Sequence, residues 1–195
     1  MKTDEMQLIS RILCGHTEDY GYFLDTYGRE VFAIVARIVM QQEDAEEITQ
    51  DAFVKAFAHL DSFNGQSSFS TWIYRIAYNC AISSLRKKRK DLFRYDEDDK
   101  LLNSISDNMA DEVLSPADDD DRIALLEKAI DRLLPEDRTL VMLFYYENRS
   151  FKEIAYILGK SENEIDQAVN MLSTRLCRIR KKLYVMIKQD RNENG

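Results

Sequence analysis

Apolar residues recur at intervals of three and four along most of the chain, which predicts a protein built from amphipathic helices. A short helical pattern covers Met6 to Leu13 and ends at Gly15, and apolar positions then dominate from Glu18 to Met40. Another helix is expected after Asp44, because Glu47 three residues later is typical of a capping box. The N-terminal half is therefore predicted to be a helical bundle.

The segment Asp61 to Lys90 places a polar loop before a further helix, for which Ser70 is the expected start. One face of this helix carries small and apolar residues and is predicted to contact a core: Ile73, Ile76, Ala77, Cys80 and Ser84. A second line carries aromatic, hydrogen-bonding and basic side chains, with Tyr74 and Tyr78 beside it: Trp72, Arg75, Asn79, Ser83 and Arg86.

A face of that kind suits nucleic acid with partly unstacked bases, because cations hold phosphates and aromatic rings offer stacking platforms. The alternative is structural. Trp72 and the tyrosines are also compatible with a core or a domain contact, and the five cations that end the helix, Arg86 to Lys90, complement its dipole.

The last third of the chain predicts a helix-turn-helix. One helix follows Arg122, Pro135 suits the first turn of the next, and Ser150 to Leu158 precedes a turn at Gly159. From Ser161 a long helix is expected, about 40 Å in length, to pack on its own domain or on a partner. Its apolar seam alternates at four and three: Ile165, Val169, Leu172, Leu176, Ile179, Leu183 and Met186.

Charge divides the chain further. The net charge is −8, yet the segment 61–90 is strongly basic and the segment 91–121 strongly acidic. Acidic runs at Asp96 to Asp99 and Asp118 to Asp121, with few apolar residues between them, predict a flexible linker at 91–121. A calcium loop is the alternative, but the ligand order of an EF-hand with its central Gly is absent. The expected domains are therefore 1–90 and 122–195.

Cofactor chemistry has little support in the sequence. The three cysteines Cys14, Cys80 and Cys177 are far apart, and His16 and His59 are isolated, so surface or capping roles are expected and no metal or cofactor is predicted. No signal peptide or apolar run of membrane-spanning length is found, which predicts a soluble cytoplasmic protein. A phosphate loop and a nucleophile motif are also missing, so a hydrolase is the least favoured function.

Two stretches resemble sigma-70 family factors of the extracytoplasmic-function (ECF) group. DAEEITQDAFVKAFAHLDSF with FSTWIYRIAYNCAISSLRKKRK is similar to region 2, and LPEDRTLVMLFYYENRSFKEIAYILGKS is similar to region 4. The resemblance implies an all-α fold of two small helical domains joined by the acidic linker. It also implies a non-enzymatic role as a promoter-recognition subunit, whose partners are the clamp and flap of core RNA polymerase, promoter DNA and, in some members, an anti-sigma factor.

The resemblance also assigns residues. It implies polymerase binding by Asp44, Glu47, Ile48, Asp51 and Val54. It implies capture of the melted minus-ten strand by a loop and the basic helix: Asn64, Gln66, Ser67, Trp72, Arg75, Asn79, Arg86, Lys87, Lys88 and Arg89. For the minus-thirty-five element the expected contacts are Arg149, Lys152, Lys160, Ser161, Asn163, Gln167, Arg175 and Arg178.

The chain departs from the family pattern at one place. Seven residues, Asp166 to Leu172, are inserted before the basic run, and Glu162, Glu164 and Asp166 lie where phosphate-facing cations are expected. The departure weakens the minus-thirty-five prediction and leaves two alternatives open. One is a stand-alone helix-turn-helix regulator, and the other is an interaction protein that uses the long last helix.

Overall fold

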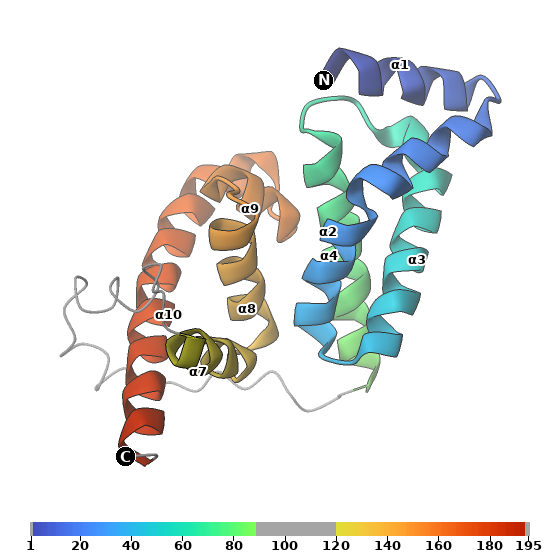
Figure 1. Ribbon diagram of the computed structural model, residues 1–195. Helices are drawn as coiled ribbons and strands as arrows, with labels where there is room; N and C mark the ends of the chain where they lie inside the picture. The colour runs from blue at the N-terminus through green and yellow to red at the C-terminus, as the bar shows by residue number, and fades with distance from the viewer. Residues whose placement is uncertain (1, 89–119, 194–195) are drawn as a thin grey trace.

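The structure is a computed structural model that describes residues 2–88 and 120–193 (Figure 1). Over these residues the protein is all-α. The helices of the N-terminal domain are α1 (Lys2–Leu13), α2 (Gly21–Val39), α3 (Gln42–Ala58) and α4 (Phe69–Lys88). Those of the C-terminal domain are α7 (Asp120–Asp131), α8 (Pro135–Val141), α9 (Phe151–Ile157) and α10 (Ile165–Glu193). The predicted linker at 91–121 lies outside the described residues except where α7 begins.

Helices α2, α3 and α4 pack together as a bundle, and α1 lies across one end of it (Figure 1). Phe69, the first residue of α4, is fully buried at the centre of an aromatic cluster. Its ring centroid lies 4.1 Å from that of Phe23 and 5.5 Å from that of Trp72. Tyr20 fixes the packing of α3, because its hydroxyl donates to the backbone oxygen of Phe53 at 2.8 Å. Burial raises the pKa of Tyr20, so its hydroxyl stays protonated.

Two predicted helix starts are corrected. Helix α4 begins one residue before Ser70, and Ser68 caps it, because the Ser68 hydroxyl accepts from the backbone N–H of Thr71 at 3.2 Å. Helix α3 begins at Gln42 with Gln41 as its N-cap, so Asp44 lies inside the first turn and forms no capping box. In both cases the serine or acidic residue chosen from the sequence sits within one helical turn of the real boundary.

The C-terminal domain follows the predicted pattern more closely. Pro135 opens α8, a π-helical turn at Met142–Tyr146 extends it, and Ser150 caps α9 through a capping box with Glu153. The turn after α9 uses Gly159 at φ 87°, a conformation that a residue with a side chain rarely adopts. A 3-10 turn (Glu162–Glu164) then leads into α10.

The long helix α10 packs on its own domain. Its 29 residues extend about 43 Å, and the buried positions face α7, α8 and α9. Ala168 and Ile187 are buried there. Most of the predicted seam is buried beside them: Leu172, Leu176, Ile179 and Leu183. Ala168 and Leu172 belong to the inserted heptad, so the insertion forms part of the domain core.

The two domains contact each other through α2 with α8 and α4 with α9. Arg138, only 5% exposed, donates to the backbone oxygen of Ile38 at 3.3 Å, near the end of α2. A cation is favourable there because the last carbonyls of a helix carry partial negative charge. The preceding residue of α2, Arg37, forms an ion pair with Asp131 at 3.1 Å. Charged groups therefore join the domains where α2 ends.

The aromatic cluster yields a stability prediction. Phe69→Ala is expected to lower the free energy of unfolding of the N-terminal domain by about 3–5 kcal/mol, because it removes a fully buried ring and leaves a cavity. Urea unfolding followed by the fluorescence of Trp72, the only tryptophan, measures this. The control Tyr22→Ala removes a ring that is 43% exposed and should cost about 1 kcal/mol or less. Equal losses for the two variants would contradict the central role of Phe69.

Candidate nucleic-acid interface

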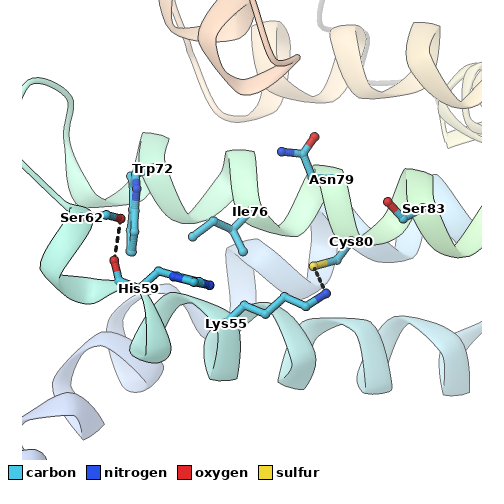
Figure 2. A pocket seen from close by; sticks show the side chains of 8 residues that line it. All are labelled: Lys55, His59, Ser62, Trp72, Ile76, Asn79, Cys80 and Ser83. Atoms are coloured by element: carbon cyan, nitrogen blue, oxygen red, sulfur yellow. Dashed lines mark hydrogen bonds between the residues drawn. The ribbon is translucent and has the colours of Figure 1, made fainter.

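A pocket of about 350 Å³ opens between α3 and α4 (Figure 2). Along α4 its wall runs from Trp72 to Ser83, and α3 with the turn behind it supplies the opposite wall. The lining residues combine an indole, aliphatic surface and hydrogen-bonding groups: Lys55, His59, Ser62, Trp72, Ile76, Asn79, Cys80 and Ser83. This mixture suits a flat heterocycle, which presents a π-face and a polar edge.

The polar groups of the pocket come from both walls. The Lys55 ammonium donates a hydrogen bond to the sulfur of Cys80 at 3.3 Å, across the gap between α3 and α4 (Figure 2). Asn79 is exposed, and its amide points away from α3. The Ser62 hydroxyl donates to the backbone oxygen of His59 at 2.6 Å. Asn79 therefore lies at the rim of the pocket, where its amide can meet a base edge, and Lys55 supplies one cation inside the pocket.

The aromatic residues of α4 are more buried than an exposed stacking face requires. Trp72 is 8% exposed, Tyr74 is 1% exposed and Tyr78 is 7% exposed, so the expectation of an open aromatic surface is wrong for this structure. Trp72 belongs to the core cluster with Phe63 and Phe69 and presents only part of its ring to the pocket. Burial, with a smaller effect of Glu136, raises the pKa of Tyr78 to about 12.

The predicted base-capture loop is preformed and exposed. The side-chain oxygen of Asn64 accepts from the backbone N–H of Gln66 at 3.1 Å, which closes a tight turn around Gly65 at φ 72°. The thioether of Met6 in α1 supports this turn, since its sulfur lies 3.4 Å from where a Cβ on Gly65 would be. Asn64 and Gln66 are exposed, and Ser67 is half-buried.

A second face of α4, formed by Thr71, Tyr74 and Arg75 and here called the contact face, is turned toward the C-terminal domain. The Tyr74 hydroxyl donates to Glu147 at 2.9 Å. Burial, then the charge of Glu147, raises the pKa of Tyr74, so this donor stays protonated. The Thr71 hydroxyl donates to Glu153 at 3.2 Å.

Cation–π contacts add to the same interface. The Arg75 guanidinium lies 4.4 Å from the ring centroid of Tyr156, and that of Arg149 lies 5.0 Å from the ring centroid of Tyr74. Arg75 and Arg149 were both predicted to contact DNA, one in each domain. In this structure each of them packs on an aromatic ring of the other domain.

The basic end of α4 and the acidic start of α3 lie side by side. Lys88 contacts both carboxylate oxygens of Asp44, at 2.5 and 2.6 Å. Arg86 and Lys87 are exposed, whereas Arg89 lies outside the described residues. The charges at positions 44 and 88 therefore neutralise each other within the domain.

The predicted polymerase-binding face of α3 is only partly available. Glu47 and Asp51 are exposed, and Val54 is 68% exposed, an unusual position for an apolar side chain. The three residues share one side of the helix because they are spaced at four and three. Ile48 is 7% exposed and packs into the domain core, so its assignment as a contact residue is corrected.

The predicted minus-thirty-five residues also divide into two groups. Arg175 is built into its own domain: its guanidinium contacts Asp137 at 2.6 Å and Glu136 at 3.1 Å. Burial alone would lower the pKa of Arg175, but this pairing outweighs burial and raises it. Lys152 lies 3.9 Å from Asp166, with both side chains strongly exposed. The other predicted residues lie on the surface near the start of α10 or along it: Lys160, Ser161, Asn163, Gln167 and Arg178.

Sequence reasoning missed most of the pocket. Lys55 was not among the predicted site residues. His59 was expected in a surface or capping role, and it is exposed at the C-cap of α3. Cys80 was assigned to the core stripe and is half-buried. The i, i+4 spacing of Lys55 and His59 was the available signal, because it places both side chains on one side of α3.

Comparison with known proteins agrees with the two-domain fold. The chain matches the family described as Sigma-70 region 2 over residues 23–91 and the family described as Sigma-70, region 4 over residues 123–183. The region 2 match spans α2 to α4, including the pocket. The region 4 match spans α7 to most of α10. No helix within the described residues is both long and apolar enough to cross a membrane.

Similar proteins align with more than three quarters of this chain. The ECF RNA polymerase sigma factor SigW of Bacillus subtilis is 31% identical over 159 residues, spanning 77% of this chain and 83% of SigW. The RNA polymerase sigma-H factor of Pseudomonas aeruginosa is 28% identical, spanning 79% and 82%. The solved structure of sigma factor RpoE with the anti-sigma factor NepR from Bartonella quintana shares the fold, with a TM-score of 0.54 at 22% identity over 83% of this chain and 96% of that one.

The pairing of Arg175 leads to a prediction that separates structural from surface cations. Arg175→Ala should lower the free energy of unfolding of the C-terminal domain by about 1.5–3 kcal/mol, because it removes charge-assisted hydrogen bonds and leaves Asp137 unpaired. Thermal unfolding followed by circular dichroism measures the loss. Lys152→Ala, at an exposed position, should change stability by about 0.5 kcal/mol or less. A destabilisation by Lys152→Ala as large as that by Arg175→Ala would refute the distinction.

Proposed function

The chain belongs to the ECF group of sigma-70 family RNA polymerase sigma factors, and we propose that it opens promoters by holding a base of the melted minus-ten strand in the pocket between α3 and α4. The supporting observation is the pocket itself, which places Trp72, Asn79 and Lys55 around one opening. Base edges would meet Asn79, and phosphates would meet the exposed cations Arg86 and Lys87. The loop at Asn64 to Ser67 would complete the site.

The proposed partners follow from the same assignment. Core RNA polymerase would dock on α3 through Glu47, Asp51 and Val54, a surface that the C-terminal domain leaves open. The C-terminal domain would contact the minus-thirty-five element through residues near the start of α10. We further propose that the protein acts in the cytoplasm and catalyses no reaction of its own. An anti-sigma factor is proposed as a negative partner, since RpoE of Bartonella quintana forms such a complex.

Polymerase docking is tested by charge reversal. The double substitution Glu47→Lys with Asp51→Lys should weaken binding to core RNA polymerase at least tenfold, because it inverts the charge of the proposed face while leaving the core of the domain intact. The measurement is a titration of labelled protein with core polymerase. Glu18→Lys with Asp25→Lys makes the same charge change elsewhere on the domain and should bind normally. Unchanged binding by the α3 variant would exclude this face.

Strand opening is tested in the pocket. Asn79→Ala and Asn64→Ala remove exposed amides without touching the core, so open-complex formation should fall several-fold while polymerase binding remains. Permanganate reactivity of promoter thymines, measured with core polymerase, reports the opening. Asn170→Ala, on the exposed side of α10, is the matched control. Normal opening by both pocket variants would refute the site, and opening without core polymerase would favour a stand-alone regulator.

A further inference from the structure

Helix α1 lies against the loop to which base capture is assigned. Figure 1 shows the N-terminal end of α1 beside the loop that joins α3 to α4. The Met6 sulfur lies 3.4 Å, and the Met6 methyl carbon 3.7 Å, from where a Cβ on Gly65 would be. Met6 is 39% exposed, so its thioether packs on this turn at the surface of the domain rather than in the core.

The turn at Gly65 combines a flexible residue with an exposed hydrogen bond. Glycine has more backbone freedom than any other residue, and Gly65 adopts φ 72°. The backbone N–H of Gln66 donates to the side-chain oxygen of Asn64 at 3.1 Å, a bond for which water competes. An apolar side chain packed beside the turn restricts its conformations and occupies none of the polar groups that a base needs.

The end of α1 that carries Met6 is itself anchored. Glu5 is 8% exposed, and its carboxylate accepts a hydrogen bond from the Tyr27 hydroxyl of α2. Burial, then the bond to Glu5, raises the pKa of Tyr27, so this donor stays protonated. The ring centroid of Tyr27 lies 5.5 Å from that of Phe69, where the loop ends and α4 begins. Helix α1 is therefore connected to the loop at two points, directly through Met6 and indirectly through Glu5.

Separate contacts hold the rest of α1 on the domain. Ile9 and Ile12 are buried, and Nε of Arg11 lies 2.8 Å from a carboxylate oxygen of Asp19. The contact between Met6 and the loop can therefore be removed while α1 stays docked. Positioning of the loop and folding of the domain are thus separable by experiment.

We propose that Met6 is a positioning residue for promoter opening, which holds the loop at Asn64 to Ser67 in the conformation that receives a base of the melted strand. This inference rests on the proposed function of that loop. A loop that is ordered before binding loses little conformational freedom when the base enters, so the strand is held more tightly. Met6 acts through Gly65 and needs no contact with DNA.

The test compares two DNAs that differ by one base, each bound by the complex of this protein with core RNA polymerase. Both carry the promoter of the permanganate assay with a premelted minus-ten element and a fluorescent label. One lacks a single non-template base, and the abasic position is moved through the element. The parent should bind the complete DNA more tightly at the captured position. Met6→Ala should lower this ratio of affinities at least about threefold, measured by fluorescence anisotropy, because the loop is no longer ordered in advance.

Two matched variants show whether the effect belongs to the loop. Met6→Leu keeps an apolar side chain of similar size and should keep the ratio. Leu13→Ala shortens a side chain that is 54% exposed at the opposite end of α1, and it should also keep the ratio. An unchanged ratio in Met6→Ala would overturn the proposal, and so would equal weakening of both DNAs or an equal fall of the ratio in Leu13→Ala. A parent that discriminates at no position would instead refute base capture, and with it the proposed function.

Discussion

Helix α4 faces the core of the bundle, the pocket and the C-terminal domain at the same time. Because positions three and four apart lie on the same line of a helix, its twenty residues form separate faces toward the core, the pocket and the C-terminal domain. Phe69, Ile73 and Ala77 are fully buried in the bundle, while Asn79 and Ser83 remain exposed beside the pocket. The contact face occupies the remaining side. The position of a residue around the axis of α4 therefore indicates whether its substitution affects core packing, DNA binding or the domain contact.

The energetics of these faces differ, and this difference suits a protein that changes partners. The core face removes large apolar groups from water, with Phe69 and Ile73 among the most buried side chains. The domain contact relies on hydroxyl–carboxylate bonds, cation–π pairs and ion pairs, which are each worth little when water can replace them. The bundle can thus stay folded while the domains separate. Domain contacts of this polar kind are normally compatible with relative motion.

The sequence predicted the helices well because their apolar spacing is regular and their breaks lie at Gly15, Pro135 and Gly159. It predicted the start of α4 only approximately, since Ser68 and Ser70 are equivalent by residue type alone. The heptad seam of α10 was visible, but spacing cannot tell whether a seam faces its own domain or a partner. Packing against α7 and α9 decides that.

The candidate site was harder to predict because it depends on pairs of residues far apart in sequence. Arg175 looks like a DNA-binding cation until Asp137, 38 positions earlier, is placed beside it. Trp72 looks like an exposed stacking platform until Phe63 and Phe69 surround it. The closed contact face could not be foreseen at all, because Arg75 and Tyr156 belong to different domains.

Site-specific photocrosslinking from the contact face tests the role of α4 in promoter opening most directly. A photoreactive amino acid in place of Arg75 should crosslink to the C-terminal domain of the same chain in the free protein. In the complex with core RNA polymerase and promoter DNA, it should crosslink instead to the non-template strand near the minus-ten element. Persistence of the intramolecular crosslink in open complexes, with no crosslink to DNA, would contradict the assignment of α4 as the helix that holds the melted promoter strand.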